Sequence, residues 1–258
     1  MKTTMRLSQL IALSLLISPI LARADEPKPL KVLWSTGGKS HDYPGLTKYL
    51  TSEIRKRANV EFVVEFDQKT LAKKDYSKDY DAVVYYFTNH DKDAETMVNN
   101  IAAAVHAGKP AMFIHGALHS FRELKEKRDA YCEAIGLTSV QHDKLKNLDV
   151  KKANPHPITL FWPKAWSTSG DELYQNVRSW PNATPLLSAY STTSKTDNVV
   201  AWVNQYGEGR VFGTTLGHDR HTADRPEYPL LLTNGLLWIC DKLDEHGNPK
   251  PGYAANPN

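Results

Sequence analysis

Histidines follow several apolar runs of this sequence, at places where α/β enzymes keep reactive groups. The clearest case is AMFIHGALHSF (111–121), in which an apolar run stops at His115 and a second histidine follows at His119. Other apolar runs lead to His41 and His218. Because imidazole ionises near neutral pH and binds divalent metals, these histidines are candidates for acid–base catalysis or metal ligation.

Polar residues follow four predicted strands, and they belong together if the strands are parallel. Ligands of open α/β sheets bind outside the carboxyl ends of the strands, so these residues would share one edge. A single histidine at a strand end is more often a hydrogen-bonded turn residue, but several that converge favour a functional site. The set comprises Gly37, Gly38, Lys39, Ser40, His41 and Asp42, then Thr88, Asn89 and His90, then His115, Gly116, His119 and Ser120, and finally Gly217, His218, Asp219 and His221.

Two familiar kinds of site are not expected. The Gly37-Gly38 turn can cradle an anion with its N–H groups, but the sequence has neither GxGxxG nor Walker spacing, which argues against a nucleotide site. Around His115, the order of strand, polar residue, glycine and helix is that of a nucleophile elbow, with imidazole in place of serine or cysteine. G-x-S-x-G is absent, so acyl-enzyme chemistry is disfavoured.

A divalent metal such as zinc remains open, although the sequence demands no cofactor. Histidine and aspartate together suit such an ion, and His41, Asp42 and Asp219 are the candidate ligands or, alternatively, orienting groups. No HExxH or other compact ligand pair is present. The ligands would therefore come from distant parts of the chain.

Alternating apolar runs and helical periodicity predict the elements that position these residues. The pattern predicts an α/β fold with a mostly parallel sheet covered on both faces. Residues 140–192 predict a late β-rich insertion, 25–247 a single domain, and the Pro- and Asn-rich residues 248–258 a loose tail. The predicted strands are 31–36, 60–66, 80–87 and 110–114, the hairpin strands are 199–203 and 209–216, and the helices are 45–58, 91–107, 119–135 and 225–243.

The first 24 residues have the pattern of a secretory signal peptide. A basic start is followed by a mostly apolar run over 7–21 and an A-x-A site at 22–24, which predicts cleavage after Ala24 and a periplasmic or secreted protein. The apolar run contains serines, a glutamine and a proline and is short for a membrane span. No membrane association is therefore expected after cleavage.

Removal of that leader leaves a chain with no net charge. Lys2, Arg6 and Arg23 are lost with no acid, so the formal net charge falls from +3 to zero. This excludes the basic footprint of a nucleic-acid-binding protein. Cys132 and Cys240 can pair in an oxidising compartment, but two unpaired buried thiols are the preferred interpretation. Formation of a homo-oligomer stays open.

Several stretches of the chain resemble the ThuA-like family, which is named for trehalose utilisation. The two most specific matching stretches carry the IHGA and GRVF…LGHD motifs, and the matches together span nearly the whole mature chain in family order. They are KVLWSTGGKSHD (31–42), YDAVVYY (80–86), GKPAMFIHGALHSF (108–121), HPIT (156–159), GDELY (170–174), YGEGRVFGTTLGHD (206–219) and GLLWI (235–239).

The resemblance implies a fold similar to class I glutamine amidotransferases, a flavodoxin-like three-layer sandwich. In those enzymes the elbow holds a cysteine and a later strand delivers a histidine, and here His115 and His218 stand at these two places. The family is associated with carbohydrate catabolism, in part with 3-keto sugars, and a metal ion has been suspected in its sites. The implied chemistry is lyase, hydrolase or isomerase action on a small-molecule carbohydrate, not cysteine amidotransfer.

Residue roles follow from the motifs and the resemblance together. His115, His218 and Glu172 are the expected catalytic residues, although Glu172 can alternatively cap a short helix. The expected substrate-binding residues are Gly37, Gly38, His119, Arg122 and Tyr174. For Arg122, binding of an anionic or enolate oxygen competes with a plain surface charge. Trp162, Trp166 and Trp180 can stack on sugar rings or, as preferred, pack in the core.

Two other functions stay open at this point. The same cleft suits a non-catalytic carbohydrate-binding protein, or the chain can be a structural partner in a sugar-uptake complex. The group of histidines favours an enzyme, because a binding protein needs stacking rings and amides but not several titratable groups together.

The leader gives a first prediction. We expect the protein purified from the periplasm of a Gram-negative host to begin at Asp25, as measured by intact mass, because the A-x-A site precedes it. Recovery of the chain only in the membrane fraction, with its first 24 residues retained, would contradict export by cleavage.

Overall fold

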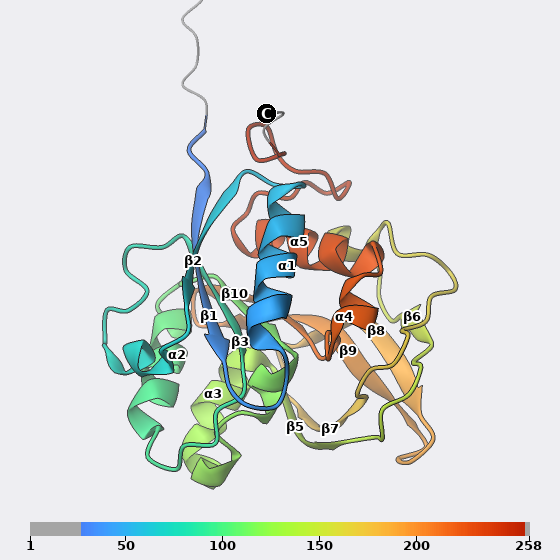
Figure 1. The fold of residues 1–258 in the computed structure, drawn as a ribbon, viewed down its shortest axis with the longest axis horizontal. Helices are drawn as coiled ribbons and strands as arrows, with labels where there is room; N and C mark the ends of the chain where they lie inside the picture. Colours follow the sequence, from blue (N-terminus) through green and yellow to red (C-terminus); the bar gives the residue numbers. More distant parts are fainter. Residues whose placement is uncertain (1–26, 256–258) are drawn as a thin grey trace, which may run out of the picture.

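The computed structural model describes residues 27–255, so the predicted signal peptide lies outside the described residues. An eight-stranded sheet runs in the order β2-β1-β3-β4-β10-β9-β8-β6 (Figure 1). The first five of these strands are mutually parallel, whereas β9, β8 and β6 join by antiparallel pairing. The strands are β1 (Leu30–Gly37), β2 (Val60–Glu65), β3 (Ala82–Phe87), β4 (Ala111–Ile114), β6 (Val150–Lys152), β8 (Thr184–Ser191), β9 (Thr196–Tyr206) and β10 (Gly209–Thr214).

Helices cover both faces of the parallel half, which confirms the predicted sandwich. One core contains side chains of α1 and α5 together with alternate residues of the sheet, and α1 contacts α5 and α4. The second core lies under α2 and α3 on the opposite face (Figure 1). The helices are α1 (Tyr43–Arg55), α2 (Glu95–His106), α3 (Asp129–Ile135), α4 (Arg220–Ala223) and α5 (Glu227–Ile239).

The continuous apolar runs have become strands buried on both faces. Every residue of β3 and β4 is buried, and Trp34 of β1 is fully buried between Phe62 and Tyr86. The strand order 2-1-3-4-10 is the flavodoxin-like arrangement, whose connections reverse direction between β1 and β3. The carboxyl ends of β1, β3, β4 and β10 therefore meet at one edge, as the sequence predicts.

The insertion is β-rich, also as predicted, but it forms two separate pieces. Strands β6 and β8 extend the main sheet, whereas β5 (Leu137–His142) and β7 (Tyr174–Ser179) form a two-stranded ribbon of their own. The chain then forms the expected hairpin of β9 and β10. Because β7 begins directly after the GDEL segment, the ribbon carries that segment to the edge of the parallel sheet.

Two predictions about local structure are wrong. The periodic segment 119–135 is not one helix: left-handed residues at Phe121 and Lys125 divide it into short 3₁₀ turns before α3 begins. The segment after Gly247 is not loose as far as residue 255, because Asn59 donates from its backbone and side chain to Tyr253 and Gly252. These hydrogen bonds tie the tail to the start of β2.

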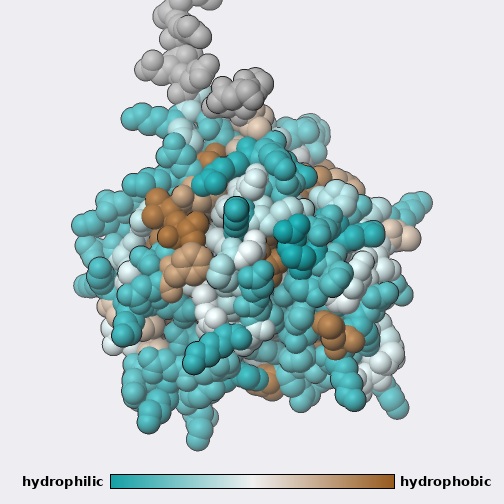
Figure 2. Space-filling view, in the orientation of Figure 1, coloured by the Kyte–Doolittle hydropathy of each residue, from teal (hydrophilic) through white to brown (hydrophobic). Residues whose placement is uncertain are grey.

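The surface and the cysteines complete the description. The face in Figure 2 is mostly hydrophilic, with a hydrophobic patch over the β2 edge, where Val63, Val64 and Phe66 are exposed. Cys132 and Cys240 are both free, in line with the preferred interpretation. Within residues 27–255, no helix combines the length and apolar character that a membrane crossing requires.

Trp202 of β9 gives a prediction about stability. Its ring is fully buried, covers Gly213 and donates from Nε1 to the Ile135 carbonyl at 2.7 Å. We expect Trp202→Ala to lower the free energy of unfolding by about 3–5 kcal/mol in urea denaturation, because it opens a cavity and orphans a carbonyl. Tyr190→Ala, at an exposed ring, should stay within about 0.5 kcal/mol of the parent. Equal losses in both variants would contradict this view of the core.

Candidate active site

His115 occupies the elbow after β4 in a strained backbone conformation. Its φ is +47°, in the left-handed region that non-glycine residues rarely enter. Gly116 makes the turn possible, because a Cβ there would lie 2.6 Å from Thr88 Cγ2 and 2.7 Å from Tyr43 Oη. The imidazole is fully buried, and its Nδ1 donates to the Thr215 carbonyl at 2.5 Å. The carbonyl only accepts, so this bond places a proton on Nδ1.

The other nitrogen of His115 faces a carboxylate. Nε2 lies 3.4 Å from Glu172 Oε2 and has no other partner among residues 27–255. With the first proton on Nδ1, two lone pairs would face each other unless a second proton or a cation lies between them. We therefore expect either a second proton on His115 or a bound cation between its Nε2 and Glu172.

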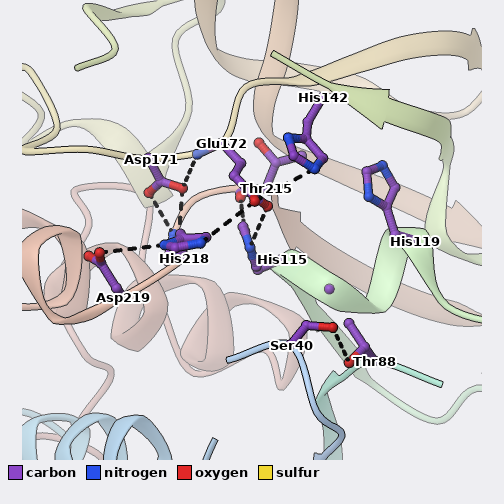
Figure 3. Close-up of polar contacts among 12 residues, drawn as sticks. Ser40, Thr88, His115, His119, His142, Asp171, Glu172, Thr215, His218 and Asp219 are labelled. Atoms are coloured by element: carbon purple, nitrogen blue, oxygen red, sulfur yellow. Dashed lines mark hydrogen bonds and ion pairs between the residues drawn. The ribbon is translucent and has the colours of Figure 1, made fainter. Parts of the chain in front are cut away.

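Glu172 is the centre of the cluster (Figure 3). Its Oε1 lies 3.6 Å from Nε2 of His218 and 3.6 Å from Nε2 of His142. His142 donates from Nδ1 to the Asp143 carbonyl at 2.8 Å, so its Nε2 also points a lone pair toward the carboxylate when the ring is neutral. One half-buried carboxylate thus faces three imidazoles.

His41 completes the group from the loop after β1. Its ring centroid lies 4.7 Å from that of His115 and 4.9 Å from that of His218, and the rings of His115 and His218 are 5.7 Å apart. The expected gathering of distant imidazoles at one edge of the sheet is therefore present. Nδ1 of His41 is buried without a hydrogen-bond partner.

Burial and mutual repulsion separate the pKa values in this group. Burial, together with the nearby His115 and His218 imidazoles, lowers the pKa of His41 to about 3. Burial alone would lower the pKa of His115, but Glu172 and Asp171 outweigh it and raise that pKa. For Glu172, burial opposes ionisation, yet the hydrogen bond and charge of His115 bring its pKa down to about 2. Glu172 is therefore ionised and His41 neutral at physiological pH.

His119 and Tyr174 form one wall of the cavity. Their rings stack with centroids 3.7 Å apart, and His119 Nε2 is hydrogen-bonded to Ser139 at 2.9 Å. Burial and the neighbouring Arg122 guanidinium lower the pKa of His119 to about 2, so its ring stays neutral. Arg122 lies at the rim and donates to the Val140 carbonyl at 2.7 Å.

The loop after β1 is held close to the end of β3. A Cβ on Gly38 would lie 2.4 Å from Thr88 Oγ1, and Gly38 has a φ of +121°. This approach places Ser40 and His41 at a cavity of about 160 Å³. The other lining residues are Thr88, His90, His119, Arg122, His142, Glu172, Tyr174 and His218, and the buried His115 lies outside this lining.

Two of the expected metal ligands, Asp42 and Asp219, are the N-caps of helices. Asp42 is exposed and accepts from Gly45 N at the start of α1. Asp219 accepts from His221 N at the start of α4, and its other oxygen lies 3.5 Å from His218 Nδ1. Asp42 is therefore a helix cap outside the group around Glu172, and Asp219 lies nearer to His221 Nδ1 (3.1 Å) than to His218 Nδ1, which makes no hydrogen bond to any residue of 27–255.

A different set of residues fits a divalent ion. One donor atom each from His41, His115 and Glu172 lie within 4.8 Å of one another. The orphaned nitrogens of His41 and His115 and the ionised Glu172 are the N and O donors that zinc binds. The fit rests on these unsatisfied atoms. His142, which the sequence analysis missed, stands just outside this set, and the only signal for it was the His-Asp pair at the end of an apolar–polar alternation.

Comparisons with known proteins agree with this architecture. The family model described as "Trehalose utilisation" (ThuA) matches residues 31–239. The chain belongs to the ThuA family. That match contains every residue of the cluster. Among proteins with curated descriptions, none matches the chain.

Solved structures share the ThuA fold at low sequence identity. A ThuA-like protein from Parabacteroides merdae is 20% identical with a TM-score of 0.65, covering 88% of this chain and 97% of that one. A cytoplasmic protein from Salmonella typhimurium is 15% identical (TM-score 0.63; 81% and 99% covered). A protein described as part of a GMP synthase from Thermoplasma acidophilum is 12% identical (TM-score 0.53; 82% and 94% covered), which links the fold to amidotransferases.

The revised ligand set gives a prediction. We expect His115→Ala and Glu172→Gln to weaken Zn²⁺ binding at least about 10-fold in calorimetric titrations, because each removes a donor atom. Asp42→Asn is the matched control: its cap lies outside the set, so Zn²⁺ affinity should not change. Loss of Zn²⁺ affinity in Asp42→Asn alone would restore the ligand assignment based on sequence.

Proposed function

We propose that this ThuA protein is an exported carbohydrate-processing enzyme that acts on 3-keto glycosides or disaccharides by acid–base chemistry. The observation that carries the proposal is the Glu172 carboxylate facing His115, His142 and His218 within 3.6 Å. Imidazole and carboxylate groups can transfer protons in the pH range in which enzymes work. The trehalose utilisation family supports a carbohydrate as the substrate.

The chemistry needs one proton acceptor and one proton donor on a single sugar ring. A ketone at C3 acidifies the proton on C2, and a base removes it to leave an enolate on the C3 oxygen. Return of that electron pair forms the C1=C2 double bond and breaks the bond from C1 to the glycosidic oxygen, which takes a proton from an acid. Water can add to the resulting enone afterwards.

The exposure of each residue to the cavity decides which of these tasks it can perform. Glu172, His142 and His218 line the cavity and can contact a bound sugar. His115 is fully buried, so it acts by holding and polarising Glu172. Arg122 at the rim is positioned to bind the sugar's oxygens. A divalent ion held by His41, His115 and Glu172 would stabilise the enolate charge as a Lewis acid, and proton transfer would then fall to His142 and His218.

The alternative of a non-catalytic sugar-binding protein has less support. Such a protein would offer exposed rings for stacking, but Trp162 and Trp166 pack against each other in the core with centroids 4.6 Å apart, and Trp180 is also buried. Tyr174 lines the cavity but is already stacked on His119. The cavity wall is instead built from titratable groups.

Turnover of a 3-keto disaccharide tests the proposal. We expect the protein to release free sugar from 3-keto-trehalose, as measured by chromatography. His218→Ala and Glu172→Gln should lower kcat by about 10²–10⁴-fold, because each removes a proton-transfer group. Tyr190→Ala, at an exposed ring outside the cavity lining, is the control and should keep full activity. Binding of the sugar without any turnover by the parent protein would favour the binding protein instead.

A further inference from the structure

Asp171 precedes Glu172 and is a buried carboxyl group with an unusual set of partners, and burial raises its pKa. Its side chain is fully buried, and none of the ion pairs found among residues 27–255 involves it. Oδ2 accepts from Gly217 N at 2.9 Å, and Oδ1 accepts from Glu172 N at 2.8 Å and from His218 N at 3.4 Å (Figure 3). Backbone N–H groups are the main partners of this side chain.

These hydrogen bonds join two distant segments at one carboxylate. Glu172 comes from the insertion, whereas Gly217 and His218 follow β10, about 46 residues later. The loop after β10 is held on its other side as well, since Tyr86 and Tyr228 donate to the carbonyls of residues 217 and 216. Asp171 therefore supplies the backbone link between this loop and the segment of Glu172, beside the hydrogen bond from Thr222 Oγ1 to the Gly170 carbonyl at 3.4 Å.

The chemistry of the side chain explains why a carboxylate stands here. Three N–H groups converge on it, and a carboxylate offers acceptors on both oxygens. An asparagine has one acceptor oxygen and would turn its NH₂ group toward at least one N–H donor. Burial of a carboxyl group is unfavourable unless hydrogen bonds satisfy it, and here three backbone N–H groups do so.

We propose that Asp171 is a positioning residue, whose carboxylate fixes His218 and Glu172 as one rigid unit at the cavity. The hydrogen bonds carry this assignment, while the role of the unit in sugar chemistry rests on the proposed function. Loss of the carboxylate would remove the hydrogen bonds to Gly217 and His218, and the imidazole of His218 would then move away from Glu172.

A second buried carboxylate provides a matched control. Asp143 is also almost fully buried, but it accepts from the side chains of Ser191, Gln175 and Lys146 and from no amide of the 215–218 loop. Asp143→Asn should therefore lower the melting temperature as Asp171→Asn does, while leaving the loop in place. Comparison of the two variants separates positioning from a general loss of stability.

Two measurements test the assignment. In Asp171→Asn, hydrogen exchange at the amides of Gly217 and His218 should speed up at least about 10-fold, with amides in the middle of β10 unchanged. Zn²⁺ affinity should fall about 10–100-fold, the usual effect of losing an outer partner of a metal ligand, and the visible spectrum of bound Co²⁺ should shift. Asp143→Asn should show none of these changes.

The outcomes distinguish this inference from the proposed function. Unchanged exchange at Gly217 and His218 in Asp171→Asn overturns the positioning role, whatever the activity. If the parent binds no Zn²⁺, the metal part of the proposed function fails, and the exchange data still decide the role of Asp171. If Asp171→Asn does not fold, exchange in the parent decides: a Gly217 amide as fast as that of Lys195, in an exposed turn, overturns the inference, and slow exchange supports it.

Discussion

The site depends on one hydrogen bond, from Nδ1 of His115 to the carbonyl of Thr215. It joins the ends of β4 and β10, which are neighbours in the sheet although the two residues are 100 positions apart. The bond fixes the tautomer of the imidazole and turns Nε2 toward Glu172. The strained backbone of His115 and the close approach of Gly116 to Thr88 occur at this same packed edge, whose contacts hold them in place.

Electrostatics explain why so many imidazoles gather there. Two adjacent acids, Asp171 and Glu172, enter a region whose described cavity lining has Arg122 at its rim but no lysine, and burial of carboxyl groups is unfavourable unless hydrogen bonds or cations compensate. Backbone amides satisfy Asp171, whereas Glu172 is left with imidazoles around it. The buried nitrogens of His41 and His115 without partners show that the cluster is incomplete as a purely structural network.

The fold is shared, but the chemistry comes from two sources. The parallel sheet with its elbow is the part that resembles amidotransferases, and it supplies His41, His115 and His218. The insertion supplies Glu172 and His142. His115 stands at the elbow of the shared fold, and Glu172 from the insertion faces its Nε2 at 3.4 Å.

The sequence by itself determined the sheet, its order of elements and the edge where the histidines meet, because apolar runs and helical periodicity act locally. It also singled out His115, His218 and Glu172, which the structure brings together. Only the tertiary structure decided which acids enter the cluster. Asp42 and Asp219 look like ligands in the sequence, but each lies at a helix start whose free N–H groups bind it. The contacts of His142 and Asp171 are with segments far along the chain. Residues 119–135 do not form the single helix that their periodicity predicts, because turns at Phe121 and Lys125 follow the elbow. Local patterns carry no information about such contacts, since packing across the sheet edge sets them.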